Sequence, residues 1–95
     1  MRIQFSARAN REFVEAADYL LEHKPEAAAN FADMLEAALA GLQKYPQMGR
    51  LTSNPPSRVF TLSWLPYRIF YEAIGNDLYI LSIFHTSQKP DELGK

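Results

Sequence analysis

Arg68 and His85 are the two side chains whose types and positions best suit a binding or catalytic role. A guanidinium presents a rigid fork of hydrogen-bond donors, and an imidazole exchanges protons near neutral pH. Both also have structural explanations. Arg68 can pair with Glu72 or with a loop, and a single histidine at a strand end is commonly a hydrogen-bonded structural residue. The residues alone leave both interpretations open.

Several motifs that carry enzyme chemistry are absent from the sequence. There is no cysteine, which excludes disulfides and thiolate metal sites. The two histidines are not spaced as metal ligands, and no H-E-x-x-H motif occurs. The chain also lacks a phosphate-binding loop, a G-x-G-x-x-G fingerprint, a G-x-S-x-G elbow and a lysine-rich patch interleaved with aromatics. These absences predict no metal and no cofactor.

Length and composition are those of one globular domain over residues 1–95. The hydrophobic share of 47% is enough for a single core in a chain of 95 residues. No signal sequence or apolar run of about 18–20 residues occurs, so we expect a cytoplasmic protein with no membrane partner. The formal net charge is −1, whereas proteins that grip bare nucleic acid are usually basic. The charge favours a protein partner and predicts no direct, specific nucleic-acid binding.

The hydrophobic periodicity predicts an α+β fold, with an N-terminal strand, an antiparallel helix hairpin and then a three-stranded antiparallel sheet. Ser6 offers the N-cap hydroxyl of the first helix, and Pro25 suits the first turn of the second. Pro46 ends the second helix because it disfavours helical geometry at the preceding residue. The expected elements are a strand over Arg2–Phe5, helices over Ala7–Glu22 and from Pro25 to Lys44 or Tyr45, a loop from Pro46 to Ser57, strands over Arg58–Trp64, Tyr67–Ile74 and Leu78–His85, and a flexible polar tail over residues 86–95.

Apolar side chains in both predicted helices recur at helical spacing and should pack on the sheet. Leu35, Leu42 and Leu62 are therefore expected to be buried. The two stripes are Phe13, Ala16, Ala17, Leu20 and Leu21 in the first helix, and Ala28, Phe31, Leu35, Ala38, Leu39 and Leu42 in the second.

Two-residue hairpin turns would sort the strand side chains onto two faces, because side chains alternate along each strand. The turns are Leu65-Pro66 and Gly75-Asn76, which place Trp64 opposite Tyr67 and Ile74 opposite Asp77. The apolar face, which should carry the helices, collects Phe60, Leu62, Trp64, Tyr67, Ile69, Tyr71, Leu78, Ile80 and Phe84. The second face collects Val59, Thr61, Ser63, Arg68, Phe70, Glu72, Tyr79, Leu81, Ile83 and His85. Arg68 and His85 would then be near-diagonal neighbours on an open surface suited to binding.

Several short motifs follow one another over nearly the whole chain, from about Ile3 to Pro90. They are Phe5-Ser6-Ala7-Arg8-Ala9, Ala16-Ala17-Asp18-Tyr19-Leu20, Pro25-Glu26-Ala27-Ala28 followed by Phe31, Leu42-Gln43-Lys44-Tyr45-Pro46-Gln47-Met48-Gly49-Arg50, the strand-opening Arg58, Pro66-Tyr67-Arg68-Ile69-Phe70-Tyr71, and Ile80-Leu81-Ser82-Ile83-Phe84-His85. In this order and spacing they resemble the bacterial toxins of the ParE/RelE superfamily. The opening and the loop motifs resemble its ParE-like branch.

The resemblance implies the toxin of a type II toxin–antitoxin system, neutralised by a cognate antitoxin. ParE-like members inhibit DNA gyrase by binding it and are not enzymes, and this is the favoured interpretation. A RelE-like, ribosome-dependent mRNA endoribonuclease, with Arg68 and His85 catalytic, is one alternative. A weakened toxin that only binds its antitoxin is another. The expected residues for binding the target or the antitoxin are Arg50, Arg58, Arg68, Phe70, Tyr79, His85 and Lys89.

The chain departs from the family pattern just after His85. An arginine commonly follows this histidine in the family, and the ribonuclease branch uses it for catalysis. Here the segment is Thr86-Ser87-Gln88-Lys89, and a lysine lacks the bidentate fork of arginine. The departure weakens the expectation of cleavage more than the expectation of binding.

Overall fold

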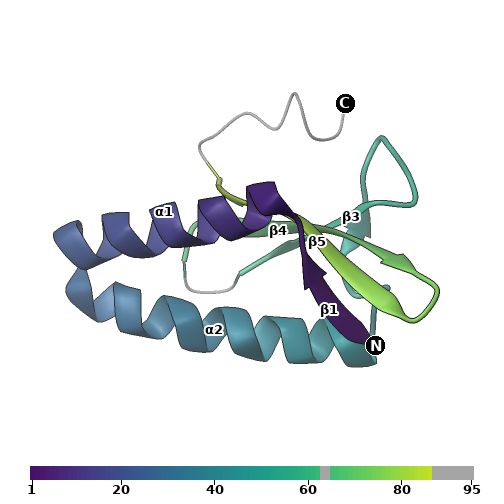
Figure 1. The fold of residues 1–95 in the computed structure, drawn as a ribbon, viewed down its shortest axis with the longest axis horizontal. Helices are drawn as coiled ribbons and strands as arrows, with labels where there is room; N and C mark the ends of the chain where they lie inside the picture. The colour runs from purple at the N-terminus through teal and green to yellow at the C-terminus, as the bar shows by residue number, and fades with distance from the viewer. Residues whose placement is uncertain (63–64, 87–95) are drawn as a thin grey trace.

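Two helices lie on one side of a five-stranded sheet (Figure 1). The structure is a computed structural model that describes residues 1–62 and 65–86. The predicted α+β class is confirmed, and the observed bounds lie close to the expected ones. In chain order the elements are β1 (Arg2–Phe5), α1 (Ala7–His23), α2 (Pro25–Lys44), β2 (Arg50–Leu51), β3 (Arg58–Thr61), β4 (Tyr67–Ile74) and β5 (Asp77–His85).

The helix hairpin begins and turns where the sequence predicts. The Ser6 hydroxyl accepts a hydrogen bond from the Ala9 N–H at 2.9 Å, which satisfies one of the free donors of the first turn. Lys24 alone separates the helices, and Pro25 occupies the first position of α2. The rings of Phe13 and Phe31 stack at 5.6 Å between the two helices. This contact joins α1 and α2 above the sheet.

The sheet has the strand order β1-β5-β4-β3-β2, in which β1 runs parallel to β5 and the other neighbours are antiparallel. The helix hairpin leads from β1 to β2 at the opposite edge of the sheet, and the antiparallel strands then return until β5 lies beside β1. The expected three-stranded sheet is thus extended at both edges. The two-residue strand β2 forms inside the segment predicted as loop, where Arg50 pairs with Val59.

The turn between β3 and β4 differs from the prediction. Thr61 pairs with Arg68, and the Leu62 N–H donates to the Tyr67 carbonyl. The strands are therefore shifted by two residues from the expected register, and Trp64 lies outside the described residues. Proline has no N–H to give to the ladder, which explains why Pro66 lies in a longer connection. A shift of two keeps each side chain on its expected face, and the second turn, with Ile74 opposite Asp77, is confirmed.

A β-bulge between β4 and β5 changes the expected sorting of side chains. Phe70 pairs with Ser82 and Tyr71 pairs with Ile80, so Leu81 is an extra residue in β5. One extra residue exchanges the faces of everything that follows it. Ile83 consequently packs into the helix-side core, whereas Phe84 packs on the opposite face. The predicted positions of these two residues were wrong for this reason.

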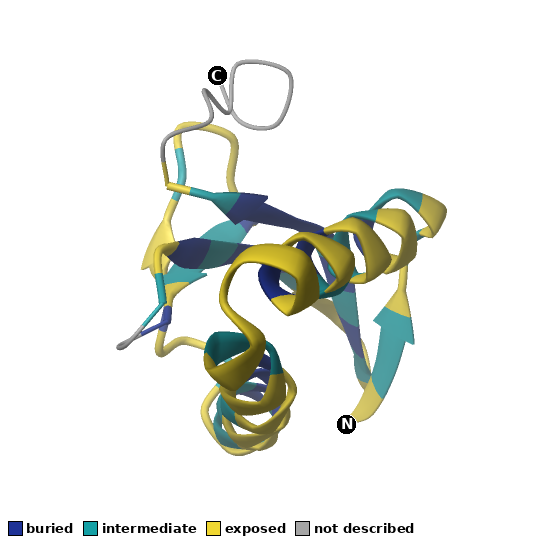
Figure 2. Ribbon diagram, turned by 90° about the vertical axis from the view of Figure 1, so that its left-hand side faces the viewer, coloured by how far each residue is buried: buried dark blue, intermediate teal, exposed yellow. Residues whose placement is uncertain are grey.

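The main core lies between the helices and the sheet, and the buried surfaces of both layers face one another (Figure 2). Leu35, Leu42 and Leu62 are buried, as predicted. Leu21 was assigned to the apolar stripe of the first helix, but its side chain is 63% exposed. The buried positions of α1 are Ala9, Ala16 and Leu20, and Leu21 lies a further 100° around the helix.

Candidate functional site

Arg68 and His85 do not form one site. Their cross-strand partners are adjacent in the ladder, because Tyr67 pairs with His85 and Arg68 pairs with Phe84. Adjacent residues of a strand point to opposite faces. His85 therefore lies on the helix side, with its ring edge-on to Tyr67 at 5.3 Å, whereas Arg68 lies on the face without helices. The expectation of a shared face was wrong because of the bulge at Leu81.

Arg68 lies beside a small apolar cluster on the face away from the helices. That cluster contains Val59, Phe70 and Phe84, with Leu81 packed against it, and we name it the second cluster. The Arg68 side chain is half-buried, and its Nε atom is buried with no hydrogen-bond partner. Within residues 1–62 and 65–86, no ion pair joins Arg68 to Glu72. A half-buried arginine that forms no ion pair with a described residue is suited to an acceptor on another molecule.

Arg58 holds the loop before β2 and is not a free surface cation. Its Nη1 atom donates to the carbonyl of Gly49 at 2.7 Å and to that of Gln47 at 3.3 Å. The Tyr71 hydroxyl accepts from the Gly49 N–H at 2.9 Å and donates to the Pro46 carbonyl at 2.7 Å. A Cβ atom at Gly49 would lie only 2.6 Å from the Tyr71 oxygen, so this close approach requires glycine. Burial raises the pKa of the Tyr71 phenol, which keeps it a donor at neutral pH.

We expect the Tyr71→Phe substitution to lower the free energy of unfolding by about 1–3 kcal/mol, because it removes both bonds of the hydroxyl and leaves the Gly49 N–H unpaired. Urea denaturation monitored by circular dichroism measures the change. Tyr45→Phe is the matched control, since that side chain is 60% exposed. Equal stabilities of the two variants would contradict a structural role for the hydroxyl.

The remaining predicted binding residues are spread over the molecule. Arg50 is exposed in the edge strand β2, while Phe70 is buried in the second cluster. Tyr79 is half-buried, and its hydroxyl donates to Asp77 Oδ2 at 3.2 Å. Lys89 lies outside the described residues. The predicted binding residues that the structure describes are therefore distributed over both faces of the sheet and its β2 edge.

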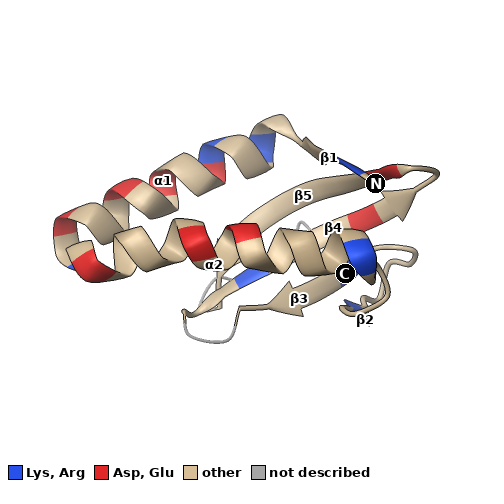
Figure 3. Cartoon of the chain, turned by 90° about the horizontal axis from the view of Figure 1, so that it is seen from below, with Lys and Arg blue, Asp and Glu red and all other residues tan. Residues whose placement is uncertain are grey.

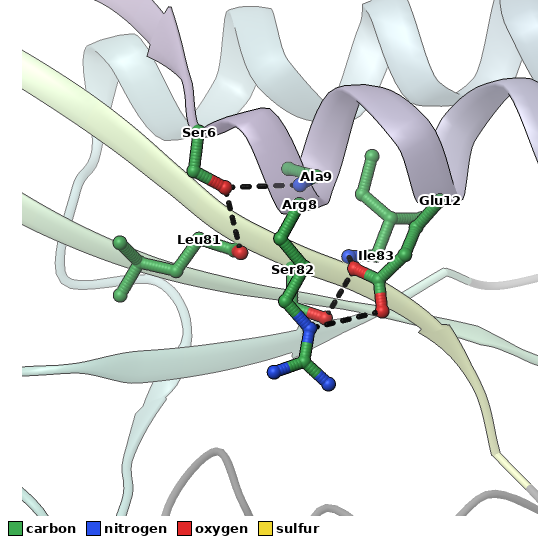
Figure 4. Close-up of polar contacts among 7 residues, drawn as sticks. All are labelled: Ser6, Arg8, Ala9, Glu12, Leu81, Ser82 and Ile83. Atoms are coloured by element: carbon green, nitrogen blue, oxygen red, sulfur yellow. Dashed lines mark hydrogen bonds and ion pairs between the residues drawn. The ribbon is translucent and has the colours of Figure 1, made fainter.

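Sequence reasoning missed a polar network that covers the edge of β5 where β1 ends (Figure 4). Glu12 Oε1 accepts from the Ser82 hydroxyl at 2.6 Å and from the Ile83 N–H at 3.1 Å, and Glu12 Oε2 lies 3.3 Å from Arg8 Nε. The Ser6 hydroxyl donates to the Leu81 carbonyl at 2.9 Å. The signal in the sequence was a carboxylate within the apolar stripe of α1.

Removing the Glu12 carboxylate is expected to lower the free energy of unfolding by about 1–3 kcal/mol, since it leaves the buried Ser82 hydroxyl and an edge N–H without an acceptor. Thermal and urea denaturation of Glu12→Ala test this. Glu36→Ala, an exposed glutamate of α2, is the control for helix propensity and net charge. If both variants unfold alike, the Glu12 contacts contribute little.

A cleft of about 380 Å³ opens beside this network, between α1 and the end of β5. Its walls combine carboxylates, aromatic rings and His85. Burial raises the pKa of the Tyr67 phenol above its ordinary value. Among the described residues no three His, Asp or Glu side chains are placed so that they could hold a metal ion together, and no helix is long and apolar enough to span a membrane. The lining residues are Glu12, Glu15, Ala16, Tyr19, Tyr67, Ile83 and His85.

Comparison with known proteins decides the family. The sequence model of the family described as "ParE toxin of type II toxin-antitoxin system, parDE" matches residues 3–90 of this chain. The chain belongs to this ParE toxin family. Two relatives have similar sequence identity to this chain. "Putative toxin Y4kP" of Sinorhizobium fredii is 33% identical over 93% of this chain and 91% of its own length. "Toxin RelE1" of Caulobacter vibrioides is 34% identical over 84% of this chain and 87% of its own length.

The fold also matches a solved member of a ParE system. A chain of the chromosomal ParDE toxin–antitoxin system from P. aeruginosa has a TM-score of 0.77, with 22% identity over 90% of this chain and 95% of that one. The resemblance to the ParE/RelE superfamily is thus confirmed. In this ParE-family chain the loop signature from Pro46 to Arg50 has a structural explanation, because Tyr71 and Arg58 bind its backbone.

Proposed function

We propose that this ParE-family toxin inhibits DNA gyrase by direct binding, through the face that carries Arg68, and that a cognate antitoxin neutralises it. The observation that carries the proposal is the half-buried Arg68, which forms no ion pair with a described residue and lies opposite Phe84 of the second cluster. A protein interface commonly centres on an arginine among apolar side chains. A net charge of −1 favours a protein target over bare nucleic acid.

Ribosome-dependent mRNA cleavage is the second candidate, and the relative named "Toxin RelE1" favours it. Cleavage of RNA needs an acid or base and several cations at one reacting phosphate. Arg68 and His85 point to opposite faces of the sheet, which argues against a shared catalytic role. The segment after His85 also supplies Lys89 where an arginine is expected.

Two assays on the purified protein separate these candidates. The first measures supercoiling of relaxed plasmid by gyrase, and the second measures mRNA cleavage on programmed ribosomes. We expect loss of supercoiling or trapping of gyrase on cut DNA, with intact mRNA. Codon-specific mRNA cuts with normal supercoiling would replace the gyrase proposal with the ribonuclease one. Inactivity in both assays together with antitoxin binding would identify a weakened toxin.

Antitoxin binding has support of its own in the sheet. The outer edges of β1 and β2 are not paired with another strand in the described sheet, and such edges accept a strand from a partner. Co-expression with the product of the adjacent small gene should give a complex that survives purification. Failure of the two proteins to associate would count against neutralisation by that product.

A further inference from the structure

We propose that the cleft between α1 and the end of β5 receives an arginine side chain of the antitoxin. The proposal rests on the proposed antitoxin partner and adds the chemistry of one contact. The cleft lies on the helix side of the sheet, whereas Arg68 lies on the opposite face.

One stripe of α1 forms the acidic wall of the cleft. Glu12 lies three and four residues before Glu15 and Ala16, and Tyr19 lies three and four residues after Ala16 and Glu15, so all of them lie on one helix face. The Glu12 oxygens already accept from Ser82, Ile83 and Arg8. Glu15 is exposed, and no described residue forms an ion pair with it. Glu15 is thus the carboxylate available to a cation entering the cleft.

The opposite wall is aromatic and well fixed. The Tyr67 ring is buried, lies 5.0 Å from that of Phe31 and meets the His85 ring edge-on at 5.3 Å. Tyr19 lines the cleft from α1, and its ring stacks on that of His23 at 4.2 Å. Faces of aromatic rings attract cations, and a planar guanidinium both stacks on them and bonds a carboxylate. These features favour arginine over lysine, whose ammonium is more strongly hydrated.

The helical layer around the cleft carries an excess of negative charge, which is complementary to an arginine. Residues 7–44 contain seven acidic and four basic side chains, and the acidic ones follow both helices (Figure 3). An excess of negative charge steers a basic segment toward this surface and disfavours an acidic one. The cleft volume of about 380 Å³ is sufficient for one long side chain.

A small probe tests the site without any antitoxin. Acetyl-arginine amide is titrated into the protein and followed by NMR, with acetyl-citrulline amide as the uncharged probe of the same shape. We expect saturable shifts at Ala16, Tyr67 and His85 with the arginine probe, and their loss in Glu15→Gln but not in Glu36→Gln. Equal shifts with both probes, or none with either, would overturn the proposal.

The antitoxin complex supplies the second arm. Glu15→Gln should weaken antitoxin binding by about tenfold, while Glu36→Gln leaves it unchanged. Replacing one arginine of the antitoxin by alanine should cause the same loss in the wild-type toxin and no further loss in Glu15→Gln. Equal affinities of the two glutamine variants would mean that the antitoxin does not use the cleft, and the proposal would fail. If the arginine probe binds but no antitoxin complex forms, the cleft does bind a guanidinium, and the antitoxin is not its source.

Discussion

The Arg68→Ala variant should inhibit gyrase supercoiling at least about tenfold less than the wild type, because an arginine beside an apolar cluster is a frequent centre of binding energy. Its melting temperature should stay within a few degrees of the wild-type value, since no ion pair or Nε hydrogen bond is lost. Arg68→Lys should be intermediate, because lysine retains the charge and loses the planar fork. The measurement is the half-inhibitory concentration in the supercoiling assay.

Arg11→Ala is the control for this series, because Arg11 is an exposed cation of α1 on the other layer of the molecule. It carries the same charge change and should leave inhibition unaltered. Two results would count against the role of Arg68. Unfolding of Arg68→Ala would show that its stem supports the sheet, and unchanged inhibition would place the gyrase contact elsewhere.

The order of elements could be predicted because each local signal agrees with the final fold. Ser6 and Pro25 start the two helices, and Pro46 follows the second one directly. The glycine turn at Gly75, with φ of +58°, has a conformation that glycine adopts without strain. These signals depend only on neighbouring residues, so a single sequence reveals them.

The faces of β5 could not be predicted beyond Leu81. Ile83 and Phe84 are both apolar, so either of them suits a core, and the hydrophobic pattern is compatible with both registers. The bulge depends on how β5 meets β4 and the start of α1, where Glu12 binds Ser82 and the Ile83 N–H. Such contacts join residues about 70 positions apart, so the local hydrophobic periodicity cannot predict them.

In the candidate site, too, the features that depend on local sequence were predicted and those that depend on distant contacts were not. Arg68 was proposed from its residue type and its strand, and its face was assigned correctly because the bulge lies in β5 and not in β4. His85 was placed on the wrong side of the sheet for the same reason. The cleft was missed because it needs α1 beside the end of β5, and its Glu15 resembles an ordinary solvated helix residue in the sequence.

Leu42→Ala should lower the free energy of unfolding by about 2–5 kcal/mol, whereas Leu21→Ala should change it by less than about 0.5 kcal/mol. Leu42 is fully buried between the layers, so truncation loses transfer free energy and leaves a cavity. Leu21 is 63% exposed on α1, where alanine also has the higher helix propensity. Both substitutions delete the same atoms from a helix, so the difference between them isolates burial. Urea denaturation with equal m-values measures both, and similar losses at the two positions would contradict the observed packing of the helices on the sheet.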